Sequence, residues 1–456
     1  MEAVTWILCG VAAVGVSLFA RWLQDRPGKS SQEAEEAWWS AGRALGLDYS
    51  EGAGWTLHGK VDGFDVLVET WTENEDPGLR EHSTPRKYTR AVLGTRGMVP
   101  AELSLKSETA LDAVRKVAGA QDVELGEAEF DKAVLVQGPE DVALAVLKPQ
   151  ARKDLLAFLA RGGVVREGEL LLKWNGELRD RKEIEGAVQS MLAVARSLAI
   201  ASVPAALLEN ATKEADPKLR RRNLTALLQM HSGSPESAKA LQAALVDADP
   251  AIRLLAARLS PAQKEAQQVL EALLDDERVP AEIRASALER LAGAWPYPEV
   301  AAHVGRAFAS DALELKRAAI AAAGAGRDVD RLVAMEKLAP LHDEGVASAL
   351  AKALATAGEL AEPGLIKLLG HESAAVRREA AAGLGKVGTV RAVEPLLPLT
   401  QGVLADGALK DAARDAVRAI QARLGDAGGG RLSVVQAVAE EGALSVGQVT
   451  RAGEKG

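Results

Sequence analysis

Histidine is the residue type in this chain best suited to metal or acid–base chemistry, because the 456 residues include six histidines and a single cysteine. The six histidines are His58, His82, His231, His303, His342 and His371. No two of them are three or four positions apart, the spacing that brings two imidazoles of one helix to a zinc ion. We expect His371, which precedes Glu372, to lie in a loop where it caps a helix or faces solvent. The histidines therefore predict no metal site.

The motifs of nucleotide-binding and hydrolytic enzymes are also absent from the sequence. It contains no Gly-x-x-x-x-Gly-Lys-Ser/Thr loop and no Gly-x-Ser-x-Gly turn. Cys9 lies in an apolar N-terminal stretch, where a nucleophile would have no base beside it. We therefore predict a non-catalytic protein without a cofactor. The alternative is an enzyme or small-molecule sensor with a pocket in the N-terminal half, lined by polar groups such as His58, Glu69 and Arg90.

The charge distribution excludes one class of partner. Residues 28–198 carry 22 Lys and Arg against 29 Asp and Glu, and residues 199–424 carry 28 against 29. Neither region offers the surplus of positive charge that phosphate backbones require. Arg220, Arg221 and Arg222 form one local basic spot, which we interpret as a solvated helix face. We predict no nucleic-acid partner and identify no small-molecule substrate.

A regular pattern organises the C-terminal half. An apolar residue that opens a helix recurs at intervals of 30 to 33 residues, at Leu219, Ile252, Ile283, Leu315, Val346, Val376 and Leu409. The residues four positions later are Asn223, Ala256, Ala287, Ala319, Leu350, Ala380 and Ala413, and small residues recur seven positions later. Helix pairs of this length cannot bury an apolar stripe alone, so they are expected to stack on one another. After Val376 we expect Gly385 and Gly388 to end the helix.

The unit Asp-Pro-x-Ile-Arg resembles the short HEAT-like repeat of the phycobilisome-lyase type. Arginine follows the opening apolar residue at Arg220, Arg253, Arg284 and Arg377, whereas Lys316 and Ala347 depart from the pattern. The resemblance covers about residues 199–424, roughly seven helix pairs, and implies an α-solenoid that binds a protein partner along its concave face. HEAT-like di-iron hydroxylases carry several His-Glu pairs, and this chain has one.

Trp295 and Tyr297 are two aromatic side chains in a solenoid that has few others. They are candidates for a contact with a protein partner, since Trp and Tyr anchor many interfaces. The alternative is that their rings fold over the gap between two repeats.

Residues 3–20 contain no charged side chain and reach the length needed to cross a bilayer. Three cations follow the stretch, Arg21, Arg26 and Lys29. Because no Lys or Arg precedes it, the positive-inside rule leaves the body of the protein in the cytoplasm. We predict a single-pass anchor in the inner (cytoplasmic) membrane over residues 1–27. A cleaved signal peptide or a buried helix are the alternatives.

Residues 28–198 are expected to form an α+β domain with an antiparallel sheet. Asp62-Gly63 and Glu167-Gly168 are turn dipeptides between apolar runs and predict two hairpins. A strand is expected over Asp131–Gln137 and a helix over Pro139–Ala160. The segments around Leu125–Asp131, Val134–Gly138 and Leu147–Pro149 resemble a bacterial domain of unknown function found next to membrane anchors.

Residues 425–456 are expected to form a flexible tail, because three glycines at 428–430 open it. The segment Arg431–Gln448 could dock on the solenoid or on a partner, or stay disordered. Taken together, the sequence predicts a membrane-anchored scaffold with an anchor, an α+β domain, a HEAT-like solenoid and a tail.

Overall fold

A computed structural model describes residues 31–73, 86–108, 123–401 and 407–426. The chain divides into two compact units, Met1–Ala243 and Ala244–Gly456. The sequence placed a boundary at 198/199, where strands give way to helices only. The compact units divide later, because the first repeat helices pack on the α+β domain.

In the described residues of unit 1, eight strands form one sheet, and each is antiparallel to its neighbours. The strands are β1 (Asp48–Glu51), β2 (Trp55–Val61), β3 (Phe64–Glu73), β4 (Arg86–Gly94), β5 (Ser104–Ser107), β6 (Val134–Gln137), β7 (Val164–Arg166) and β8 (Glu169–Asn175). Their order across the sheet is β1-β2-β3-β4-β8-β7-β5-β6. Both predicted hairpins are present. Asp62, Gly63, Glu167 and Gly168 all have positive φ, as tight two-residue turns require.

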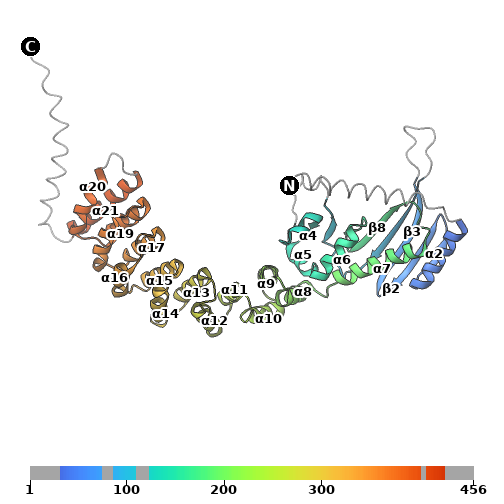
Figure 1. Cartoon of the computed structure of the whole chain (residues 1–456), viewed down its shortest axis with the longest axis horizontal. Coiled ribbons are helices and arrows are strands. Elements are labelled where there is room, and N and C mark those ends of the chain that lie inside the picture. The colour runs from blue at the N-terminus through green and yellow to red at the C-terminus, as the bar shows by residue number, and fades with distance from the viewer. Residues whose placement is uncertain (1–30, 74–85, 109–122, 402–406, 427–456) are drawn as a thin grey trace, which may run out of the picture. The chain divides into compact units, whose positions relative to one another are not determined.

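Helices α2 (Ser31–Leu45) and α7 (Arg181–Leu198) cover one face of this sheet (Figure 1). Trp38 of α2 is fully buried, its ring centroid 5.9 Å from that of Trp55, and its indole N–H donates to the Leu178 carbonyl at 2.7 Å. α7 contributes an apolar stripe that includes Ile184 and Val188. The opposite face carries half-exposed side chains, including Trp71 stacked on Tyr88.

Two secondary-structure predictions for unit 1 were wrong in part. Residues 131–133 are not in a strand but end α4 (Ala128–Ala133), because the Asp131 carboxylate accepts hydrogen bonds from the backbone N–H groups of Leu125 and Gly126. The expected helix 139–160 is two helices, α5 (Glu140–Val146) and α6 (Pro149–Leu159). Pro149 disfavours helical geometry at the residue before it and starts a new helix.

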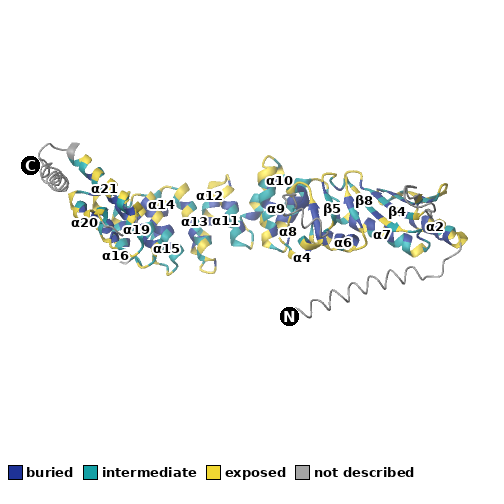
Figure 2. Ribbon diagram, turned by 90° about the horizontal axis from the view of Figure 1, so that it is seen from above, coloured by how far each residue is buried: buried dark blue, intermediate teal, exposed yellow. Residues whose placement is uncertain are grey.

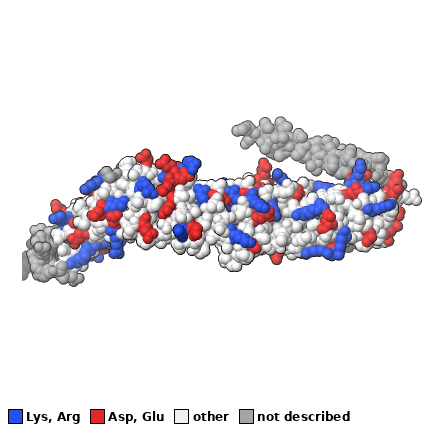
Figure 3. Space-filling model, turned by 90° about the horizontal axis from the view of Figure 1, so that it is seen from below, with Lys and Arg blue, Asp and Glu red and all other residues white. Residues whose placement is uncertain are grey.

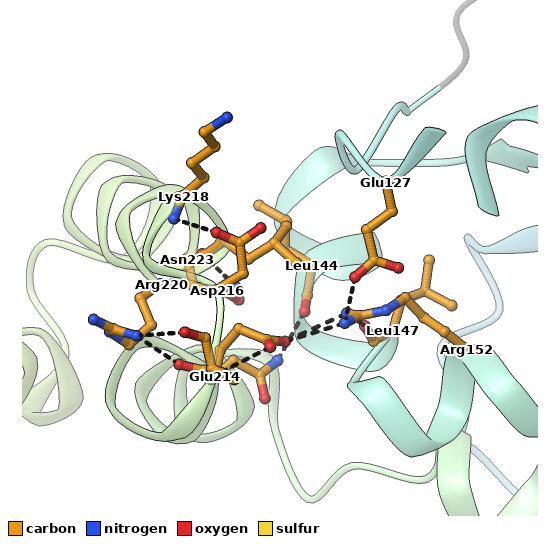
Figure 4. Close-up of polar contacts among 12 residues, drawn as sticks. Glu127, Leu144, Leu147, Arg152, Glu214, Asp216, Lys218, Arg220 and Asn223 are labelled. Atoms are coloured by element: carbon orange, nitrogen blue, oxygen red, sulfur yellow. Dashed lines mark hydrogen bonds and ion pairs between the residues drawn. The ribbon is translucent and has the colours of Figure 1, made fainter. Parts of the chain in front are cut away.

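The first repeat helices are part of unit 1. They are α8 (Val203–Lys213), α9 (Pro217–Met230) and α10 (Pro235–Ala244), which reaches the boundary. Arg152 of α6 and Glu214 after α8 are only 7% and 8% exposed and lie 3.4 Å apart (Figure 4). Arg152 also pairs with Glu127 at 2.8 Å and donates to the Leu147 carbonyl. The Asn210 amide donates to the Leu144 carbonyl at 2.8 Å. Buried polar contacts thus join the first helix pair to the α+β domain.

Unit 2 consists of helices only in the part that the structure describes. They are α11 (Pro250–Leu259), α12 (Gln263–Asp275), α13 (Ala281–Ala294), α14 (Tyr297–Ala309), α15 (Leu313–Ala325), α16 (Val329–Leu338), α17 (Glu344–Leu354), the 3₁₀ turn η1 (Glu359–Ala361), α18 (Glu362–Leu368), α19 (Ala374–Val387), α20 (Val390–Gln401) and α21 (Gly407–Asp426). One hydrophobic core runs through them from Leu254 to Ile420. Figure 2 shows their buried residues where consecutive helices meet.

The predicted period matches the observed burial. Six of the seven opening apolar residues are buried, Ile283 being half-buried, and all seven residues four positions later are buried. Gly385, however, does not end its helix: α19 continues to Val387. A Cβ at Gly385 would lie 3.1 Å from the Ala416 Cα, so this glycine lets α21 approach α19 closely.

The membrane-spanning stretch predicted at residues 3–20 and the tail from Ala427 onwards lie outside the described residues. In the part of the chain that is described, no single helix is both long and apolar enough to cross a membrane. α7 and α8 meet those criteria only when counted together, and they are bent by 84° at their junction.

Candidate functional site

The inner helices of unit 2 form the surface best suited to binding. In Figure 1, α13, α15, α17 and α19 line the inner side of the curve that the repeats follow, and α12, α14 and α16 lie on its outer side. Small side chains bring the inner helices together: a Cβ at Gly324 would lie 3.0 Å from the Ala353 Cα. Because the floor between such helices is made of alanine and glycine, hollows remain above it.

Two hollows are built at equivalent repeat positions. The first, of about 420 Å³, lies between α15 and α17, and the second, of about 740 Å³, between α19 and α21. We call them the α15–α17 hollow and the α19–α21 hollow. The residues two, six and ten positions after the opening apolar residue of each helix line both hollows. These residues are Arg317, Ala321, Ala325, Ser348, Lys352 and Thr356 in the first hollow, and Arg378, Ala382, Lys386, Asp411, Asp415 and Ala419 in the second.

A polar bridge separates the two hollows. The Glu379 carboxylate of α19 accepts a hydrogen bond from the Ser348 hydroxyl at 2.5 Å and pairs with the Lys352 ammonium at 3.0 Å. Both partners lie on α17, so these contacts bridge the space between α17 and α19. Inner helices stand roughly 8–10 Å apart, which places the two hollows about 20 Å from each other.

Charges of both signs surround these hollows. The lining of the α15–α17 hollow includes Glu289, Arg317 and Lys352. Figure 3, which views the molecule from below, shows Lys and Arg intermixed with Asp and Glu over that other face of the repeat helices as well. In the α15–α17 hollow, Arg317 pairs with Glu314 at 3.3 Å within its own helix. The floor of each hollow is thus made of small apolar residues, and charged side chains stand at its rim.

The two aromatic candidates hold neighbouring repeats together. The Tyr297 hydroxyl donates to Asp328 at 2.9 Å, and a Cβ at Gly326 would lie 2.3 Å from the Tyr297 ring. Trp295 packs half-buried against the core of unit 2. Burial, followed by the hydrogen bond to Asp328, raises the pKa of Tyr297 to about 12. Burial alone would raise the pKa of Asp328, but hydrogen bonds from Arg331 and Tyr297 outweigh it and lower that pKa.

The residues proposed for a pocket in unit 1 lie on the half-exposed face of the sheet. Glu69 and Arg90 are directly opposite each other on β3 and β4 and form an ion pair. His58 is exposed on β2, opposite Leu67. The three share one sheet face, and neither of the two hollows described above includes them.

His371 uses both ring nitrogens inside the fold. Its Nε2 contacts the Leu341 carbonyl at 2.7 Å, and its Nδ1 accepts from the Ser373 N–H at 3.0 Å. The imidazole therefore links one repeat to the start of the next helix. Among the residues that the structure describes, no three His, Cys, Asp or Glu side chains are grouped to hold a metal ion.

The hollows were not identified from the sequence. Their signal is the run of small or charged residues two, six and ten positions after each opening apolar residue, a helical stripe beside the buried one. In the sequence alone, such a stripe cannot be distinguished from an ordinary solvent-facing helix surface. It lines a hollow only because the helix of the next repeat packs beside it.

Comparison with known proteins identifies the repeats. Residues 336–422 match the family model of HEAT repeats. No curated protein matches the chain. A solved structure of human deoxyhypusine hydroxylase in complex with glycerol is similar to this chain, with 22% sequence identity and a TM-score of 0.23. The match covers 48% of this chain and 84% of the hydroxylase chain. The family match thus places HEAT repeats at residues 336–422, within the series of stacked helices that the structure describes in unit 2.

Proposed function

We propose that the protein is a membrane-anchored, non-catalytic scaffold whose inner solenoid face binds a protein partner. The match to HEAT repeats supports this proposal, since such repeats generally mediate protein interactions. The observation that carries it is the pair of hollows on the inner helices, built at equivalent positions about 20 Å apart. A partner that spans both gains from two weak contacts at once.

Two finer assignments belong to the same proposal. The Asp-Pro-x-Ile-Arg unit favours the short, phycobilisome-lyase type of repeat, as a class of fold only. The uncharged stretch at residues 3–20 and the cations after it favour an anchor in the inner membrane with both units on the cytoplasmic side. The α+β domain then stands between the membrane and the solenoid in the chain.

Site-specific cross-linking tests the binding face. A photo-reactive amino acid replaces Ala321 or Ala382, which are exposed in the hollows, in the full-length protein in its own cells. The matched control is Ala302, an exposed alanine of the outer helix α14. We expect the same cross-linked protein from both hollows and none from the control.

A second variant connects the cross-link to binding. Ala321→Arg and Ala382→Arg together place bulky charges in the hollows and are expected to reduce partner capture at least about tenfold, or about 1.4 kcal/mol. Ala302→Arg should leave capture unchanged. Equal cross-linking from Ala302, or undiminished capture by the double variant, would refute the proposal.

A further inference from the structure

The lining of the α19–α21 hollow includes two cations that form no ion pair with an acidic side chain among the described residues. They are Arg378 and Lys386, both exposed and eight positions apart on α19. The acidic residues of the hollow have partners elsewhere. Asp411 lies 3.7 Å from Arg414, Asp415 lies 3.0 Å from Arg418, and Glu379 pairs with Lys352 at 3.0 Å.

A ligand for this hollow therefore needs two chemical features. Carboxylates would pair with Arg378 and Lys386, and apolar side chains would cover the floor, which includes Ala382, Gly385 and Ala416. A strongly acidic segment without apolar residues would leave the floor in water. A purely apolar segment would leave the two cations unpaired as they lose solvent, which costs free energy.

The end of this chain has that composition. After Asp426 come Ala427 and three glycines, and then the segment Arg431–Gln448 with the sequence RLSVVQAVAEEGALSVGQ. Its only acidic residues, Glu440 and Glu441, are adjacent and lie between Val438 and Leu444.

Helix α21, which precedes this segment in the chain, ends beside the hollow. The Arg423 guanidinium, near the end of α21, donates to the carbonyls of Gly385 and Gly388. This holds the last turn of α21 against the end of α19 where Lys386 is located. Glu440 is 14 residues beyond Asp426, a reach of up to about 46 Å, whereas Arg378 and Lys386 are only about 12 Å apart along their helix.

We propose that residues 431–448 occupy the α19–α21 hollow of their own chain. Glu440 and Glu441 lie beside Arg378 and Lys386, and Val438 and Leu444 cover the alanine and glycine floor. A short tether gives an effective concentration on the order of 1 mM, so an intrinsic Kd of about 0.1 mM fills the hollow about 90% of the time. If the inner face binds a partner, as the proposed function states, this occupancy lowers the partner's apparent affinity about tenfold.

Zero-length coupling by a carbodiimide tests the contact in the full-length protein. The reagent joins a carboxylate to an amine only when the two touch, so we expect an amide link between Lys386 and Glu440 or Glu441 in the monomer, detected by peptide mass spectrometry. Arg378→Glu should lower its yield at least threefold, because the pocket then repels the segment. Arg378→Glu combined with Glu440→Lys should restore the yield, with Glu441 as the coupled residue. Arg391→Glu, at an exposed site on α20 that does not line the hollow, is the matched control and should change nothing.

Three results would overturn the proposal. One is the absence of any link between Lys386 and the segment, and another is an equal yield in the Arg378→Glu variant. The third is a link that joins two chains, which a mixture of ¹⁴N- and ¹⁵N-labelled protein reveals, because the occupant is then a second copy. None of these results affects the cross-linking from Ala321 in the other hollow, so failure of this proposal and failure of the proposed function are distinguishable.

Discussion

The arginine of the repeat signature serves the fold. Arg220, Arg253 and Arg377 each use Nη1 to donate to the backbone carbonyls six and five positions earlier, at distances from 2.7 to 3.1 Å. Those carbonyls belong to the turn between helices, where regular helix bonding has stopped and acceptors lack partners. Lys316 donates to a carbonyl in the last turn of α14, that of Phe308, at 2.9 Å. The basic residues that recur at the repeat period are therefore hydrogen-bonded to backbone carbonyls within the repeats.

Arg152 offers a test of the joint between α6 and the first repeat. Arg152→Met removes the charge but keeps most of the volume, and it leaves the Glu214 carboxylate buried without its partner. We expect the free energy of unfolding of unit 1 to fall by about 3 kcal/mol. Urea unfolding followed by tryptophan fluorescence reports on unit 1, since seven of the eight tryptophans precede residue 200. Arg181→Met breaks an exposed pair with Glu185 and should cost less than about 1 kcal/mol. Equal losses in the two variants would show that the buried pair does not support the joint.

Tyr297 makes a distinct prediction about alkaline pH. Its pKa is raised from 10.0 to about 12 in the folded protein. The stabilising contribution of its protonated hydroxyl is thus fully present below pH 10 and is lost as the pH rises through about 12. Tyr297→Phe should cost about 1 kcal/mol at neutral pH and flatten the fall in stability between pH 10 and 12. Chemical unfolding at a series of pH values measures both. Asp328→Asn should move the late tyrosinate absorbance change toward pH 10, and an unchanged titration would contradict this account.

At the scale of elements, the inner helices depend on small residues where they cross. Glycines 324 and 385 and alanines 353 and 416 occupy the closest approaches, α15 against α17 and α19 against α21. Helix α21 is the last helix of this series among the described residues. Arg414 and Arg418 lie five and nine positions after Leu409. Both are exposed, and each forms an ion pair within α21, which gives this helix a polar outer side. A polar terminal face is what the end of a repeat array needs in water.

Gly324→Ala and Gly293→Ala separate helix propensity from packing. A Cβ at Gly324 would lie 2.8 Å from the Ala353 Cβ, so α15 and α17 must move apart. We expect a net loss of about 1–2 kcal/mol even though alanine favours helix. A Cβ at Gly293 of α13 meets nothing within 4 Å, so this control should gain up to about 0.5 kcal/mol. Thermal unfolding followed by circular dichroism compares them, and a stabilised Gly324→Ala variant would show that the crossing tolerates a methyl group.

At the scale of the whole molecule, the α+β domain and the first repeat helices make one compact unit. Besides Arg152 and Glu214, the joint includes His231 with Asp141 at 2.9 Å and Arg222 with Glu140 at 2.6 Å. The α+β domain thus covers the start of the repeats, as an N-terminal cap would.

Membrane attachment is predicted at this scale too. Removing residues 1–27 should move the protein from the membrane to the soluble fraction with the midpoint of its thermal unfolding unchanged, because the described core contains none of those residues. Sodium carbonate washing provides the control, since it removes peripheral proteins and leaves the full-length chain in the membrane. A truncated body that stays in the washed membranes would refute the anchor.

The sequence by itself determined the features that depend on local spacing. The repeat of 30 to 33 residues, the buried residue four positions after each opening apolar side chain, and the two hairpin turns all follow from helix periodicity and turn chemistry, which act within about ten residues. The α+β class and the solenoid class could be predicted for the same reason. Gly385 shows the limit, because the sequence pattern marked it as a helix end and a neighbouring helix made it a contact point.

Only the tertiary structure decided what distant segments do together. Arg152 and Glu214 are 62 positions apart, and the residues around either one do not indicate that it pairs with the other. The two hollows likewise need helices about 30 residues apart to stand side by side, with the bulk of each side chain setting the space between them. Contacts of this kind depend on which surfaces pack, and packing is settled by the summed burial of many side chains rather than by any short stretch of sequence.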